Sequence, residues 1–174
     1  MSRRLFAEDY TVSEYKAILR VIRDLHVAWE GPLFDAQGNP FLADGESLHS
    51  IAPRLDHDLA FLGCFETPRL IDAPTLPECD TARLGVHYVL VGASFGAASI
   101  HRYLKRSLGD NIAPQLQYHR AQPDNIAWAT LKRLMTRPYA IAGATKTVAA
   151  ARQVFETFYA EFAALEVRPT ASID

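Results

Sequence analysis

The chain has 174 residues, of which 49% are hydrophobic and 22% charged, and its formal net charge is -2 at pH 7. This composition is ordinary for a globular protein, and the length suits a single domain over residues 1–174 with a substantial core. No basic run or RNA-binding motif is present and no stretch reaches the roughly 18 apolar residues of a membrane span, so neither nucleic acid nor a membrane is an expected partner.

The first half of the chain has the pattern of two helices joined by a polar loop. Thr11 and Glu14 have the spacing of a capping box, and apolar residues then recur at helical intervals as far as Gly31. The turn-rich stretch FDAQGNPFLADGES follows. A second helical pattern then covers residues 51–62.

Residues 64–79 contain three prolines and both cysteines, and this composition predicts a connector. The cysteines lack metal-ligand spacing and the start of the chain lacks a signal-peptide pattern, which favours a cytoplasmic protein with free thiols. Asp80 can cap a long helix that runs to about Leu108, Pro123 suits the first position of another, and apolar residues at 148–165 mark the last. No alternating run with hairpin turns occurs, so the predicted fold class is all-α.

The long helix contains the stretch GVHYVLVGASFGAAS, residues 85–99, which places Gly92 and Gly96 inside a helical pattern. A glycine in a helix interior costs roughly 1 kcal/mol relative to alanine, so both glycines need a reason. Either a neighbouring helix packs closely against them, or a flat and largely apolar ligand with an anionic edge lies there. Helical geometry places on the same face, within roughly 60° of Gly92, the residues Gly85, Tyr88, Phe95, Gly96, Ser99, Tyr103 and Arg106.

This stretch resembles the distal-helix signature of bacterial, biliverdin-producing heme oxygenases, in which Tyr-Val-Leu-Glu-Gly-Ser precedes Leu-Gly-Gly or Leu-Gly-Ala. The stretches SEYKAILRVIRDLHVAWEGPL, RLDHDLAFLG and ARQVFETFYAEF resemble other helices of that family, so the similarity runs from about residue 5 to 165. The resemblance implies a heme-oxygenase-like multihelical domain whose helix kinks at Gly92 and Gly96 and approaches heme there. The expected heme or tetrapyrrole site comprises Tyr88, Gly92, Gly96, Ser99, Tyr103 and Arg106, with the guanidinium on a propionate.

Three departures from the family pattern bear on catalysis, and no catalytic residue is assigned. The family's proximal His lies on a helix that precedes the segment matched by residues 13–33, so an N-terminally short member without that helix is expected. His26, followed by Glu30, aligns with the second helix and is kept as the one candidate iron ligand. Ala93 replaces the Asp of animal members that organises distal water, and Val91 replaces a bacterial Glu. Without a proximal imidazole the iron lacks the support that heme degradation uses.

Three functions remain open from the sequence. The first is a carrier, buffer or sensor of heme or a related tetrapyrrole, a pseudoenzyme with little or no heme-degrading activity. The second is an active heme oxygenase that releases biliverdin, CO and iron, with a phytochrome as receiving partner. The third is an interaction protein with a closed pocket. The missing helix would expose apolar surface, which predicts a homodimer with heme held between its subunits.

The other histidines are expected to lie away from the ligand. His87 and His101 are about 140° and 180° around the long helix from Gly92, which predicts surface or packing roles. His49, His57 and His119 occur in polar sequence without ligand-like spacing, which predicts exposure to solvent.

Overall fold

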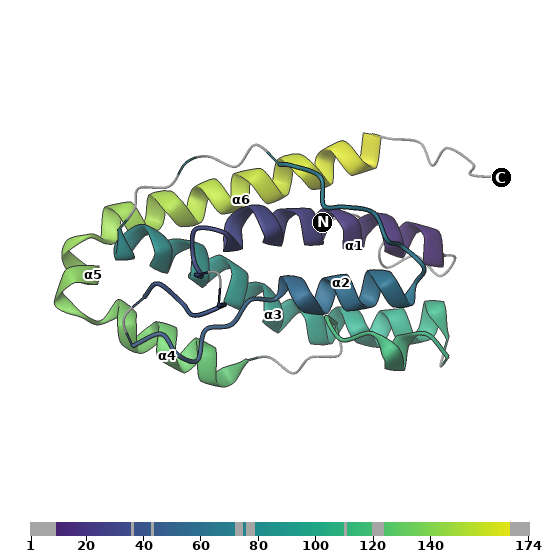
Figure 1. The fold of residues 1–174 in the computed structure, drawn as a ribbon, viewed down its shortest axis with the longest axis horizontal. Coiled ribbons are helices and arrows are strands. Elements are labelled where there is room, and N and C mark those ends of the chain that lie inside the picture. Colours follow the sequence, from purple (N-terminus) through teal and green to yellow (C-terminus); the bar gives the residue numbers. More distant parts are fainter. Residues whose placement is uncertain are drawn as a thin grey trace.

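The structure is a computed structural model that describes residues 10–35, 37–42, 44–71, 75, 79–109, 111–119 and 124–167, apart from the side chains of 97–99, 166 and 167. The predicted all-α class is confirmed for these residues (Figure 1). The elements are α1 (Val12–Glu30), α2 (Ala52–Phe61), α3 (Asp80–Leu108), the 3-10 turn η2 (Ala113–Gln115), α4 (Asn125–Met135), α5 (Pro138–Ala142) and α6 (Ala144–Val167).

The helix ends follow local capping chemistry. The predicted capping box of α1 is present: the Glu14 amide donates to the Thr11 hydroxyl at 3.2 Å, and the Glu14 carboxylate accepts from the Thr11 amide at 2.8 Å. The N-cap of α3 is Cys79 rather than Asp80, so the Asp80 carboxylate lies inside the first turn, where the helix dipole favours it.

The helices after residue 124 differ in detail from the prediction. Asp124 caps α4 by accepting from the Ala127 amide at 2.8 Å, so α4 begins at residue 125. Pro123, expected at its first position, lies outside the described residues. The short α5 was not predicted; it starts at Pro138, which is well suited to a first helical position, and Gly143 separates it from α6.

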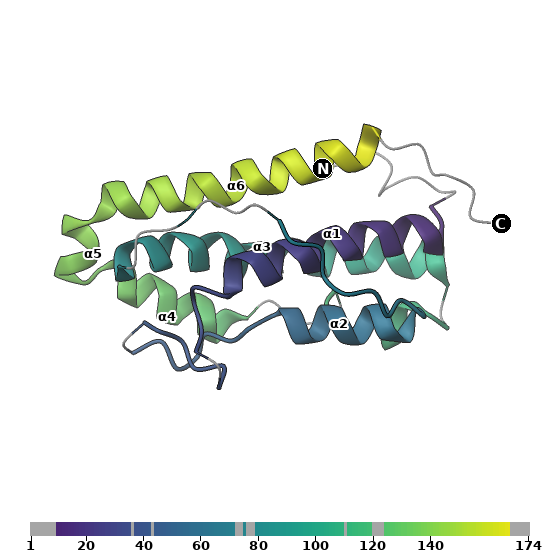
Figure 2. The same ribbon diagram turned by 45° about the horizontal axis from the view of Figure 1, so that its top comes forward.

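The helices form three tiers, which Figure 2 shows from top to bottom as α6, then α1 with α3, then α2 with α4. One core cluster joins α1, α2 and the second half of α3, and another joins the first half of α3 to α6 and the end of α1. A third cluster packs α4 against Leu84 of α3 and against Leu42 and Leu48 of the 31–51 loop. The expected polar stretch therefore contributes the buried Leu42 to the core, and Leu48, which directly follows it, is buried as well.

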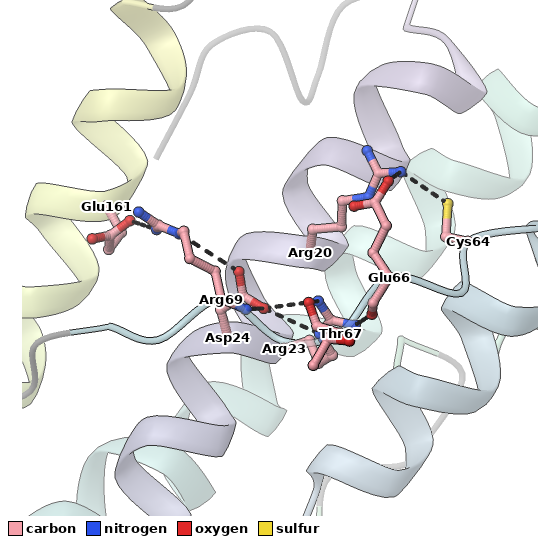
Figure 3. Close-up of polar contacts among 8 residues, drawn as sticks. All are labelled: Arg20, Arg23, Asp24, Cys64, Glu66, Thr67, Arg69 and Glu161. Carbon is pink, nitrogen blue, oxygen red and sulfur yellow. Dashed lines mark hydrogen bonds and ion pairs between the residues drawn. The ribbon is translucent and has the colours of Figure 1, made fainter.

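A buried ion pair on α1 holds the connector between α2 and α3 against the bundle (Figure 3). Arg23 donates to the Asp24 carboxylate at 2.9 Å and to the backbone oxygen of Glu66 at 2.7 Å. The same carboxylate accepts from the Arg69 amide at 3.2 Å, and the Arg69 guanidinium pairs with Glu161 of α6. Because both members of the pair are bonded to the connector as well as to each other, their loss of hydration is offset.

Helix α3 is bent: its first arm, Asp80–Gly96, and its second arm, Ile100–Leu108, make an angle of 47°. Sharp bends of this kind occur where glycines interrupt a helix, and the bend falls directly after Gly96. Among the described residues, no single helix has the length and apolar character to cross a membrane; only the two arms of α3 taken together reach that threshold, on length and composition alone.

Candidate functional site

The three glycines of the 85–99 stretch have different surroundings. A Cβ atom added to Gly85 would lie 2.2 Å from the Thr147 backbone oxygen and 3.0 Å from the Ala150 Cβ, so α6 crosses directly over this position. A Cβ added to Gly92 or Gly96 would meet no described atom within 4 Å outside the backbone of α3 itself. Close helix packing therefore explains Gly85, whereas the face around Gly92 and Gly96 is open.

Aromatic side chains border this open face. Tyr88 and Phe95 are seven residues apart on α3, and both contact the Trp128 ring of α4, with centroid separations of 5.5 and 5.4 Å. Tyr88 remains 41% exposed and Phe95 38% exposed, so each presents part of its ring to solvent beside the glycines. The contribution of Trp128 could not be found from sequence, where this residue only marks the apolar side of α4.

The bend divides the predicted site between the two arms of α3. Tyr88, Gly92 and Gly96 lie on the first arm. Tyr103 and Arg106 are both exposed on the second arm, so the straight-helix geometry that placed them beside Gly92 holds only within each arm. The side chain of Ser99 lies outside those described. The structure therefore groups the first three predicted residues and leaves the other two beyond the bend.

His26 is enclosed in the core and is 1% exposed. Its Nδ1 lies 2.7 Å from a carboxylate oxygen of Glu30, and the ring packs edge-on against Tyr118 and Phe158. The buried Nε2 has no hydrogen-bond partner among the described residues. An imidazole oriented by a carboxylate with its second nitrogen free resembles a metal-binding histidine, but this one is closed off by aromatic rings.

The Glu30 carboxylate is fully used in joining α1 to the start of α2. Besides His26, it accepts from the Ser50 hydroxyl and from the backbone amides of Ile51 at 2.9 Å and Ala52 at 3.3 Å. Burial raises the pKa of Glu30, but the hydrogen bonds from His26, Ser50 and Ile51 outweigh it and leave the pKa below its usual value. The carboxylate is therefore a structural anchor in its ionised form.

The His26 and Glu30 pair lies on the opposite side of α3 from the open glycine face. Glu30 lines a small pocket of about 30 Å³ together with the α3 residues His87, Leu90, Val91 and Ser94. Those four positions are about 100–160° around the helix from Gly92. The structure therefore does not bring His26 to Gly92 and Gly96, and the predicted iron ligand and the predicted glycine face form separate sites.

Two further histidines are buried, and one of them contradicts the prediction. His87 packs in the core as expected, and burial lowers its pKa to about 4. His119 was expected in solvent, and this was wrong: it is 2% exposed, and its Nδ1 is 2.8 Å from the Tyr15 hydroxyl. Burial, with a contribution from His101, lowers the pKa of His119 to about 3. Burial also raises the pKa of Tyr15, so the hydroxyl in this hydrogen bond is neutral.

The remaining histidines and the acidic residues form no metal centre in the part of the chain that is described. His49 and His57 are exposed as expected, and His101 is half-buried. No group of three or more His, Cys, Asp or Glu side chains among the described residues is arranged to hold a metal ion.

Comparison with known proteins adds no family to this geometry. No protein-family model matches the chain, and neither a curated protein nor a solved structure is found to match it. The interpretation of the site therefore rests on its own residues: two unhindered glycines on a bent helix, bordered by a cluster of aromatic rings.

Proposed function

We propose that the chain binds heme or a related tetrapyrrole against the open face of α3 and acts as a carrier, buffer or sensor with little or no heme-degrading activity. The observation that carries this proposal is the open space over Gly92 and Gly96. A flat ring can approach a helix backbone closely only where no Cβ intervenes. The exposed parts of Tyr88 and Phe95 offer aromatic contact at the edge of such a ring.

The described residues fit the ring of a tetrapyrrole better than they fit the iron of heme. The glycine face has room for a planar group, whereas Arg106 lies on the second arm of α3, beyond the 47° bend, so its pairing with a propionate stays a prediction. His26 cannot serve as the axial ligand in this arrangement, because its ring is 1% exposed and is enclosed by Tyr118 and Phe158. This enclosure favours binding over catalysis, since a heme oxygenase uses a neutral histidine on the iron.

Titration of the purified protein with hemin tests the proposal. A saturable Soret band is expected, and Gly92→Leu or Gly96→Leu should raise the dissociation constant at least about tenfold because the new side chain fills the space for the ring. Ala60→Leu, an exposed substitution on α2, is the matched control and should leave binding within about twofold. His26→Ala should also leave the dissociation constant for hemin unchanged.

The same cuvette separates the proposed carrier from an active heme oxygenase. After ascorbate is added in air, the Soret band of a carrier persists, whereas decay into biliverdin absorption would replace the proposal with the enzyme. The absence of a saturable band, or equal affinity in wild type and both glycine variants, would contradict binding at this face.

A further inference from the structure

A small pocket lies between the end of α1, the first arm of α3 and the start of α4. Glu30 lines it from α1, His87 and Ser94 line it from α3, and Asp124 lines it at the N-cap of α4. Apolar side chains form most of the rest of its wall. The volume of about 30 Å³ accommodates one or two groups of the size of a water molecule.

His87 brings an unpaired polar atom to this pocket. The residue is 2% exposed, and its buried Nε2 has no hydrogen-bond partner among the described residues. Burial lowers the pKa of His87 to about 4, so the ring is neutral at neutral pH. A neutral imidazole accepts a hydrogen bond through Nε2 when its proton is on Nδ1. Because buried polar atoms are normally paired, this nitrogen indicates that the pocket holds a bound group.

The other polar side chains of the pocket also offer acceptors. The Ser94 hydroxyl donates its proton to the Val91 backbone oxygen at 2.7 Å, which leaves only its lone pairs for a bound group. The Asp124 carboxylate accepts from the Ala127 amide at 2.8 Å through one oxygen and has the capacity to accept further hydrogen bonds. His49 can accept through one ring nitrogen. A group that satisfies these side chains must therefore be rich in donors.

The charge of the pocket favours a cation. Burial raises the pKa of Glu30, but the hydrogen bonds to its carboxylate outweigh burial and leave the group ionised at neutral pH. The chain itself uses the lone pairs of Glu30, so this residue acts on a bound group through its negative charge, which is weakly screened in apolar surroundings. Asp124 adds a second carboxylate, and the described residues that line the pocket include neither lysine nor arginine.

We propose that this pocket binds an ammonium ion. Ammonium is about as large as a water molecule, carries a positive charge, donates through every hydrogen and has no acceptor. It therefore matches both the acceptors around the pocket and the charge of Glu30. Potassium has a similar size and charge, but it cannot donate a hydrogen bond to the His87 Nε2. The proposal uses residues outside the predicted tetrapyrrole site, so it does not depend on tetrapyrrole binding.

Thermal unfolding of the whole chain without hemin, followed by circular dichroism at neutral pH, tests the proposal. Ammonium chloride, potassium chloride and tetramethylammonium chloride are compared at equal concentrations, so that ionic strength and chloride stay constant. A ligand that binds only the folded chain raises the unfolding temperature. We expect a saturable rise with ammonium chloride that the other two salts do not give, because potassium donates no hydrogen bond and tetramethylammonium is too large for the pocket.

Two substitutions and a matched control assign the effect to the pocket. His87→Leu removes the Nε2 acceptor, and Asp124→Asn removes a charge but keeps an oxygen for the Ala127 amide. Each should raise the dissociation constant for ammonium at least about tenfold. Asp56→Asn removes an exposed carboxylate from α2 and should leave this constant within about twofold.

Three results would overturn the proposal. They are a wild type without an ammonium-specific rise, equal rises with ammonium and potassium, and a rise that the folded variants retain in full. Asp124→Asn decides alone if circular dichroism shows that His87→Leu does not fold.

Discussion

Acidification from pH 6.5 to about 4.5 is expected to lower the free energy of unfolding by about 2 kcal/mol per pH unit on average, because two buried histidines stay neutral in the fold. Burial lowers the pKa of His87 to about 4 and of His119 to about 3, from the usual 6.5. Below pH 6.5 the unfolded chain therefore binds two protons that the folded chain does not. The stabilising contribution of the two neutral histidines is complete well above pH 6.5 and is lost as the pH falls.

Urea unfolding followed by circular dichroism over this pH range measures the slope. Replacing His87 by Leu removes one titrating group whose Nε2 has no described partner, so the slope should fall to about half. Ala60→Leu, an exposed substitution on α2 that neither adds nor removes a titrating group, is the control, and the slope should be unchanged. A wild-type stability that stays constant between pH 6.5 and 4.5 would contradict the burial of these imidazoles.

Adding one methyl group at Gly85 is expected to destabilise the fold by about 2–3 kcal/mol, which is at the upper end of the cost of overpacking. The added methyl group would lie 2.2 Å from the Thr147 backbone oxygen, so two helix backbones must separate. The same change at Gly92 or Gly96 meets no neighbour and should stabilise the helix by about 0.5–1 kcal/mol.

Urea unfolding at pH 7.5 compares the three alanine variants, which share one chemical change on one helix. The free energy of unfolding is expected to fall in Gly85→Ala and to rise in the other two variants. A destabilisation of similar size at all three positions would mean that another helix also covers Gly92 and Gly96, which would remove the open face on which the proposed function rests.

Local signals in the sequence predict much of the fold. The capping box at Thr11 and Glu14 locates the start of α1, and helical periodicity locates α2 and α3, because these features depend on residues close together in the chain. The glycine face was predicted as well, but only the structure separates Gly85, which α6 covers, from Gly92 and Gly96, which are open.

The features that sequence reasoning missed depend on contacts between distant residues. His119 is buried because Tyr15, 104 residues away in the chain, provides its hydrogen bond. Glutamate is usually exposed, yet the Glu30 carboxylate accepts hydrogen bonds from the backbone amides of Ile51 and Ala52 at the start of α2, more than twenty residues later in the chain. His26 was a candidate iron ligand because its spacing to Glu30 imitates one, and only packing shows that its ring is enclosed in the core.

The most direct test of the glycine face is an amide NMR spectrum of the protein labelled with ¹⁵N-glycine, recorded with and without diamagnetic zinc protoporphyrin. The nine glycines give a small set of signals that can be assigned by substitution. We expect large ring-current shifts for Gly92 and Gly96 and unchanged signals for Gly85 and Gly143, which are packed against other atoms of the chain. Saturation with zinc protoporphyrin that leaves Gly92 and Gly96 unshifted would contradict the account.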